Sequence, residues 1–446
     1  MDFEGKGNWN ISFAGAGFMG LYHVGVAQCL QERAPRLLQG AHCVYGSSSG
    51  AIYATSLVCG MSVDFCCSYY MEMTTAVKRL SLGIFHPAFT PVEYIKQVLQ
   101  ENLPANAHIL ASQRLGISLT RWPDGKNIIV TNFATRDELI QAVICSMYIP
   151  FYCCMIPPEF RGERYLDGGL SNNIPFKDNE FTITVSPFPG TLDICPQSTS
   201  ANMHEMSTFN LNLQISTMNV FLMFLALFPP SPEVVANICR QGYLDALRFL
   251  ERRGLTKEQI LWSLAFKAPP SPAEGAQDSG CNQEGKAGLT LNWAVPNVLV
   301  KDVPNFEQLS PALEAALRKA CKRKPGLWVH FWQSGSGQVL TYLLLPCTFP
   351  VEYVYFQSKR VVEWFPDALA DLHWMQEQLR GLAHGLYSRT KTQLFGPVRA
   401  GLDELPARLS VDPEHCLTRF SQPHMLRTCA NLYPLLYNMS LEADPL

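Results

Sequence analysis

Charged side chains are scarce in this sequence. Asp, Glu, Lys and Arg make up 16% of its 446 residues and leave a net charge of −3 at pH 7. Such a chain has no global basic field, so no nucleic-acid partner is expected, and binding to an anionic membrane would have to come from local patches. The hydrophobic share of 47% is large enough to fill an extensive core.

The sequence also lacks the patterns of disulfide frameworks, metal sites and secretory signals. Its fifteen cysteines are odd in number and scattered, without a C-x-x-C pair. This distribution is typical of reduced core thiols, and neither a metal nor another cofactor is expected. Residues 1–10 are polar and lack an apolar signal core, which favours a cytoplasmic rather than a secreted protein.

No apolar run reaches the roughly 20 residues that a membrane-spanning helix needs. Residues 220–228 are apolar throughout, which predicts a buried helix or strand or, alternatively, a lid or interfacial segment. Two prolines and a glutamate interrupt the apolar residues 339–356, which argues against a membrane-spanning helix. The alternative for this segment is a monotopic hairpin that lies in a lipid monolayer. Leucines at helical spacing over 368–386 predict an amphipathic helix, for core packing or for a membrane surface.

A serine motif is present in a strand-to-helix setting. Residues 46–50 read Gly-Ser-Ser-Ser-Gly and follow a short apolar strand, and a helix is expected over 51–58. This setting is typical of the strained turn that exposes a nucleophilic serine. Gly46 and Gly50 are then required because a Cβ at either flank would collide with the neighbouring strand or helix. Ser48 is the candidate nucleophile, and a helix-capping serine turn is the alternative.

A glycine loop lies upstream of the serine motif. Residues 15–20 read Gly-Ala-Gly-Phe-Met-Gly between an expected strand at 10–14 and an expected helix at 21–30. Backbone N–H groups at such a turn suit a phosphate or a developing oxyanion. A dinucleotide site would need an acidic residue at the end of the second strand, which instead ends at Tyr45 and Gly46. An oxyanion hole is therefore favoured, with a plain tight turn as the alternative.

An aspartate followed by two glycines supplies a candidate base. Asp167 ends an apolar strand, and Gly168 and Gly169 let the backbone turn away so that the carboxylate can face a pocket. Alone, such a sequence is more often only a turn. Together with Ser48, it offers a carboxylate that can accept the serine proton without an imidazole.

These motifs together resemble the patatin-like phospholipase family, whose lipases use a Ser-Asp dyad. The resemblance implies oxyanion donors around Gly15, Gly17 and Gly20, with Ser48 as nucleophile and Asp167 as base. Further segments are similar to the subgroup that contains adipose triglyceride lipase and adiponutrin: 9–15, 85–87, 115–121, 156–158, 182–188 and 241–250.

One departure and one alternative bear on the chemistry. Plant and bacterial patatins usually carry Lys or Arg where this chain has Met19, which favours a neutral acylglycerol over a phospholipid. A Ser-Asp-His triad would need a histidine after Asp167, and those present lack an evident strand-loop setting. His23, one turn into the first expected helix, is a minor alternative. The dyad is therefore the preferred interpretation.

The order of expected elements predicts an α/β fold. Short strands alternate with helices up to about residue 266, which indicates a central, mostly parallel sheet between helical layers, the three-layer patatin-like fold. Active groups are then expected at the carboxyl ends of strands. The predicted division is a lipase domain over 1–255, a Pro/Gly-rich linker over 256–290, and a less regular targeting and regulatory region over 291–446.

These features predict a triacylglycerol lipase that acts at lipid droplets in triglyceride catabolism, with transacylation where an acylglycerol replaces water. The expected partners are a neutral-lipid acylglycerol substrate, a lipid-droplet or membrane surface, and a protein co-activator. The alternative is a catalytically weak droplet protein that binds neutral lipid and modulates another lipase or its co-activator.

Overall fold

The computed structural model describes most of the chain up to residue 256 and two later segments. The described residues are 9–154, 156–197, 205–208, 211–214, 217–256, 309–321 and 335–403. The expected linker over 256–290 therefore lies outside the described residues from residue 257 onward. The chain divides into two units, Met1–Glu363 and Trp364–Leu446, and each is considered by itself.

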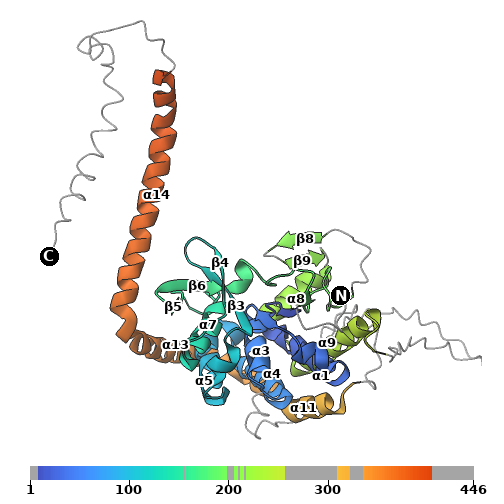
Figure 1. Ribbon diagram of the computed structural model, residues 1–446. Coiled ribbons are helices and arrows are strands. Elements are labelled where there is room, and N and C mark those ends of the chain that lie inside the picture. The colour runs from blue at the N-terminus through green and yellow to red at the C-terminus, as the bar shows by residue number, and fades with distance from the viewer. Residues whose placement is uncertain are drawn as a thin grey trace, which may run out of the picture. The chain divides into compact units, whose positions relative to one another are not determined.

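A seven-stranded mixed sheet forms the centre of the first unit (Figure 1), with the strand order β5-β6-β3-β2-β1-β7 and β4 also paired to β3. Its strands are β1 (Asn10–Phe13), β2 (Cys43–Gly46), β3 (Leu115–Arg121), β4 (Asn127–Val130), β5 (Glu159–Phe160), β6 (Glu163–Asp167) and β7 (Thr182–Val185). The strands β7, β1, β2 and β3 run parallel, whereas β4 and β6 are antiparallel to β3, and β5 to β6. The expected α/β fold with a mostly parallel sheet is confirmed. A separate hairpin consists of β8 (Glu205–Thr208) and β9 (Leu211–Gln214).

Helices follow most strands of the first unit. They are α1 (Leu21–Arg33), α2 (Pro35–Gln39), α3 (Ser49–Val58), α4 (Val63–Lys78), α5 (Pro91–Asn102), α6 (Ala107–Ala111), α7 (Arg136–Ser146), α8 (Thr217–Leu227), α9 (Pro232–Arg252), α11 (Pro311–Cys321) and α13 (Gly335–Trp364). Single 3₁₀ turns are η1 (Gly17–Gly20), η2 (Gly83–Phe85) and η3 (Gly168–Leu170). The second unit contains η5 (Phe365–Asp367) and α14 (Ala368–Asp403).

Several helix starts are set by local side chains. The Thr135 hydroxyl accepts from the Glu138 N–H at the start of α7, and Ser231 accepts from the Val234 N–H at the start of α9. Pro232 occupies the first position of α9, where the missing N–H costs no hydrogen bond. These caps explain why the chain leaves its loops as helix at these points.

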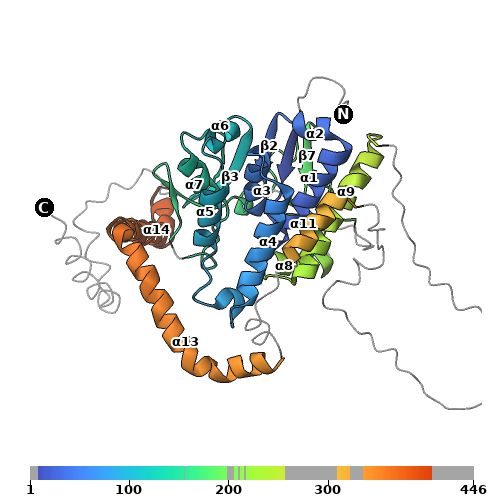
Figure 2. The ribbon, with the colours of Figure 1, turned by 90° about the horizontal axis from the view of Figure 1, so that it is seen from below.

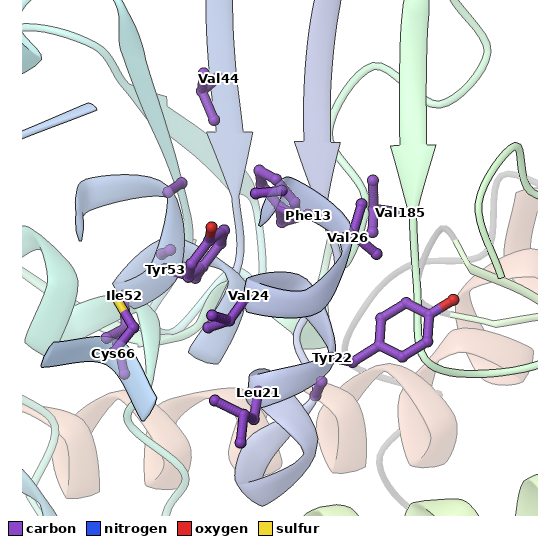
Figure 3. Packing of buried hydrophobic residues seen from close by; sticks show 14 of the residues in the cluster. Phe13, Leu21, Tyr22, Val24, Val26, Val44, Ile52, Tyr53, Cys66 and Val185 are labelled. Atoms are coloured by element: carbon purple, nitrogen blue, oxygen red, sulfur yellow. The ribbon is translucent and has the colours of Figure 1, made fainter. Parts of the chain in front are cut away.

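The hydrophobic core joins the sheet to the helices that follow it. Ile11 and Phe13 of β1 are completely buried. Figure 3 shows Phe13 beside Val24 of α1 and Tyr53 of α3, so the strand before the glycine loop packs against the helix that follows this loop and the helix that follows the serine motif. Burial of such side chains is the main stabilising contribution to this arrangement.

Two glycines allow α1 and α9 to cross in backbone contact. A Cβ on Gly25 would lie 1.9 Å from the Cys239 carbonyl oxygen, and one on Gly242 would lie 2.2 Å from that of Tyr22. Figures 1 and 2 show the two helices side by side. The segment 241–250 is therefore part of the core of the first unit.

The three apolar stretches all contain helices. One face of α8 is exposed, including Val220 and Phe224, whereas Leu222 is buried. The helix α13 continues through Pro346 and Pro350 and is bent in Figure 2. The hairpin considered for this segment is therefore wrong, because a proline inside a helix can kink it without ending it. The helix expected from Ala368 is confirmed as α14, and its amphipathic role stays a prediction.

Among the described residues, no single helix is long and apolar enough to cross a membrane. The pair α8 and α9 satisfies the length and composition together, with a bend of 120° between them.

Candidate active site

The candidate site lies where two strands run toward each other. β4 occupies one side of β3, and β2 and β6 share the other side. Gly46, at the end of β2, pairs with Ile117, and Asp167, at the end of β6, pairs with Leu119. The two strand ends are therefore only two residues of β3 apart, about 7 Å. Both candidate groups lie at the carboxyl ends of strands as expected, although β6 reaches the site from the antiparallel direction.

Ser48 occupies a strained turn between β2 and α3. Its backbone has φ 54° and ψ −126°, a conformation that costs a non-glycine residue about 1–3 kcal/mol. A Cβ on Gly46 would lie 2.4 Å from the Gly50 carbonyl oxygen, and one on Gly50 would lie 2.4 Å from that of Phe13. The two flanking glycines are thus required by close backbone contacts, as the serine motif predicts.

The Ser48 side chain is near enough to the Asp167 carboxyl to lower the pKa of that carboxyl through hydrogen bonding. Asp167 is buried, and its Oδ1 also accepts from the Gly169 N–H at 2.7 Å. Burial raises the pKa of Asp167 to about 6, and the hydrogen bonds from Ser48 and Gly169 oppose this rise. A carboxylate with this pKa is ionised at neutral pH yet basic enough to accept a proton.

Two amides of the glycine loop are already hydrogen-bonded. The Gly15 N–H donates to Asn173 Oδ1 at 2.9 Å, and the Ala16 N–H donates to Ser49 Oγ at 2.8 Å. The N–H groups of Gly17 and Phe18 have no partner within the described ranges. The Gly15 N–H, which was expected to bind the oxyanion, already has a partner, so Gly17 and Phe18 are the better candidates for oxyanion donors.

The remaining glycines of the motifs are required by packing. A Cβ on Gly17, which has φ +52°, would lie 2.0 Å from the Ala226 carbonyl oxygen of α8. A Cβ on Gly20 would lie 2.3 Å from the Tyr70 hydroxyl, so Gly20 faces α4 rather than Ser48.

Gly168 and Gly169 bring the loop after Asp167 close to its neighbours. A Cβ on Gly168 would lie 1.9 Å from the Ser118 carbonyl oxygen, and one on Gly169 would lie 2.9 Å from Asn173 Oδ1. Both glycines therefore allow the Asp167 turn to pack against β3 and against the side chain that holds Gly15.

Two residues of the site carry no motif in the sequence. Ser146, the last residue of α7, accepts from the Ser48 N–H at 2.9 Å and donates to the Ser118 carbonyl at 2.7 Å. Asn173 binds Gly15, as described above. Ser146 ties the serine turn to β3. Only Asn173 could have been suspected from the sequence, because it closely follows the Asp-Gly-Gly motif.

The side chains of His23 and Met19 are both buried in the core and are not available to a substrate. His23 is completely buried, and its Nε2–H donates to the Ala14 carbonyl at 2.8 Å. Burial lowers the pKa of His23 to about 4, so the ring is neutral and supports the end of β1. The Met19 side chain is also completely buried. The residue at this position therefore does not contact the substrate, and it gives no direct reason to prefer a neutral acylglycerol over a phospholipid.

The described cysteines and acidic side chains bear on disulfide and metal sites. No disulfide joins the cysteines whose side chains the structure describes. Within the same residues, no group of three His, Cys, Asp or Glu side chains is arranged to hold a metal ion.

Comparisons with known proteins place this geometry in a family. Residues 11–179 match the family described as patatin-like phospholipase. The chain is 66% identical over 395 residues to patatin-like phospholipase domain-containing protein 5 of Homo sapiens, covering 89% of this chain and 92% of that protein. The chain belongs to the patatin-like phospholipase family. The resemblance drawn from the motifs is thereby confirmed.

Two further members of the patatin-like phospholipase family are similar over most of the chain. Patatin-like phospholipase domain-containing protein 2 of Rattus norvegicus is 39% identical over 437 residues, covering 98% of this chain and 87% of that protein. The mouse protein named 1-acylglycerol-3-phosphate O-acyltransferase Pnpla3 is 40% identical over 375 residues, covering 84% of this chain and 88% of that protein.

Proposed function

We propose that the protein is a lipid ester hydrolase with Ser48 as nucleophile and Asp167 as base. The observation that carries this proposal is the position of the strained Ser48 beside the buried Asp167, at the facing ends of β2 and β6. A helix-capping serine has no need of a positive φ or of a carboxylate partner with a raised pKa.

In the proposed reaction, Asp167 accepts the hydroxyl proton while Ser48 Oγ attacks the ester carbonyl carbon. The Gly17 and Phe18 amides stabilise the resulting oxyanion, at about 2.7–4 kcal/mol per donor in comparable sites. The bond to the leaving alcohol breaks, and the alcohol takes the proton from Asp167. A water molecule, deprotonated by Asp167, then attacks the acyl carbonyl carbon. The bond to Ser48 Oγ breaks, Ser48 Oγ takes the proton back from Asp167, and the fatty acid is released.

The proposed substrate is a neutral acylglycerol, with triacylglycerol as the first choice. The residues beside Ser48, namely Gly15, Ser146, Asp167 and Asn173, include no cation that would bind a phosphate head group. The exposed apolar face of α8, next to the glycine loop, supports a substrate supplied from a lipid phase.

Acyl transfer is the second candidate function. One relative, at 40% identity, carries the printed name 1-acylglycerol-3-phosphate O-acyltransferase. The same acyl-enzyme would transfer its acyl group to the hydroxyl of an acylglycerol acceptor in place of water. Incubation with labelled acylglycerol tests this, because transfer gives a labelled product with one more acyl chain and hydrolysis gives labelled fatty acid only.

The proposed place of action is the surface of cytoplasmic lipid droplets, with a protein co-activator as a further partner. Exposed apolar residues on α13, such as Val351 and Val362, and on α14, such as Leu369, support contact with a lipid monolayer. Flotation of purified protein with phospholipid-coated triolein droplets tests the surface, and recovery of all protein in the aqueous fraction would contradict it.

The decisive experiment compares Ser48→Ala with Ser47→Ala on emulsified triolein. The neighbouring Ser47 is a matched control, because its buried hydroxyl has no hydrogen-bond partner among the described residues. We expect Ser48→Ala to lose fatty-acid release and Ser47→Ala to keep it. Full activity of Ser48→Ala would refute the mechanism. Droplet binding without hydrolysis by the unmodified protein would favour the alternative, a binding protein that modulates another lipase.

A further inference from the structure

The helix α13 is attached to the loop after η2 by two polar side chains. Glu352 Oε2 lies 2.9 Å from His86 Nε2. Arg360 Nη2 donates to the carbonyl oxygens of Pro87, at 2.7 Å, and Phe89, at 3.0 Å. These contacts join residues more than 260 positions apart in the sequence.

The geometry around His86 fixes the direction of its hydrogen bond. His86 Nδ1 accepts from the Ala88 N–H at 3.1 Å, so Nε2 carries the proton that is donated to Glu352. The His86 side chain is buried, and the rings of Phe349 and Phe356 of α13 stand edge-on to it. Partial exclusion of water strengthens a contact of this kind relative to a fully exposed ion pair.

The same loop packs against the glycine loop of the candidate site. Phe89 forms a small separate cluster with Phe18 and Val77, and Phe18 is the residue after Gly17. Phe89 also contacts the ring of Tyr152, whose hydroxyl donates to a carbonyl at the end of α8. A continuous set of contacts therefore leads from α13 through Phe89 to the proposed oxyanion donors.

We propose that α13 braces the oxyanion loop. Glu352 and Arg360 are positioning residues, because they hold the His86–Phe89 loop in the place where it supports Phe18. This inference rests on the proposed function, since it assigns the Gly17 and Phe18 amides to the oxyanion. It adds that a helix outside the motif-bearing part of the chain determines how well those amides are placed.

The outer face of α13 carries exposed apolar residues that could contact a lipid surface. Val354 and Val361 are strongly exposed, and their helical spacing places them on the side of the helix opposite Glu352. The helix therefore has one face for the catalytic unit and one for lipid. Contact of the outer face with a surface would act on the same rigid element that supports the oxyanion loop.

The test uses the full chain and a short-chain p-nitrophenyl ester below its critical micelle concentration, so that no lipid surface is needed. We expect Glu352→Ala and Arg360→Ala each to lower kcat about tenfold, with KM within about twofold, because small displacements of catalytic groups are costly. Glu352→Gln keeps an acceptor for the His86 N–H and should recover most of kcat. Lys359→Ala is the matched control, because Lys359 pairs with Glu363 of the same helix and should leave kcat unchanged.

The outcomes separate the brace from the proposed function. Wild-type kcat in both alanine variants would overturn the brace, as would an equal loss in Glu352→Gln and Glu352→Ala. Full activity of Ser48→Ala in the same assay would instead overturn the proposed function. Hydrogen exchange gives a second readout: the alanine variants should exchange faster at residues 15–20 and 83–89, and unchanged exchange there would also overturn the brace.

Discussion

Asp167→Asn should make the protein more stable and less active, with both effects set by the burial of one carboxylate. Burial raises the pKa of Asp167 from 3.8 to about 6. This difference of about two pKa units corresponds to about 3 kcal/mol, at about 1.4 kcal/mol per unit. The folded state therefore holds the Asp167 proton more tightly than the unfolded state, and stability falls as the pH rises from about 4 to about 6.

The neutral asparagine removes this pH dependence. Above pH 6 we expect Asp167→Asn to raise the free energy of unfolding by up to about 3 kcal/mol, whereas below pH 4 wild type and variant should be nearly equal. Loss of the base should lower kcat at least about 100-fold at pH 8. Urea unfolding at pH 4 and pH 8, together with ester hydrolysis, measures both effects, and the exposed Asp178→Asn is the control. An equal stability change at both pH values, or retained activity, would refute the reasoning.

Three further predictions follow from the same site. The kcat/KM of the wild type for a soluble ester should rise with pH through an apparent pKa near 6, because only ionised Asp167 can accept the proton, and a flat profile between pH 5 and 7 would contradict this. Gly17→Ala should abolish most activity because its Cβ would meet Ala226, whereas Gly60→Ala, at φ +72° with open space around it, should cost only about 1 kcal/mol in thermal unfolding and leave activity intact. Asn173→Ala should lower kcat about tenfold with little change in KM, since it releases the Gly15 amide and loosens the oxyanion loop; equal kcat values would show that this contact is dispensable.

The residues that sequence motifs predicted are those whose roles follow from local backbone geometry. The turn at Ser48 needs a glycine on each side, and the Asp167 carboxylate needs a sharp turn after it, so both leave a short, readable pattern. The fold class could be predicted because the alternation of short strands and helices is visible along the sequence.

The supporting residues could not be predicted because their partners are distant in sequence. Ser146 and Ser48 are 98 positions apart, and Asn173 and Gly15 are 158 apart. The antiparallel approach of β6 likewise depends on pairing with β3 and not on any pattern within β6. Such contacts are determined only when the whole sheet is assembled.

The course of α13 shows a different limit. Its two prolines suggested an interruption, and the helix nevertheless continues through both. Proline removes one backbone hydrogen bond and bends a helix, and the contacts of Glu352 and Arg360 with the η2 loop lie beyond both prolines. The sequence shows the prolines that disfavour a continuous helix, but it does not show the tertiary contacts made by the same helix.

The central claim is that Ser48 is the nucleophile, and covalent labelling tests it most directly. Folded wild-type protein is treated with a fluorophosphonate, digested, and analysed by peptide mass spectrometry. The account predicts an adduct on Ser48, loss of esterase activity in proportion to labelling, and no labelling at this site in Ser48→Ala. An unlabelled Ser48 in protein that still hydrolyses acylglycerol esters would contradict it.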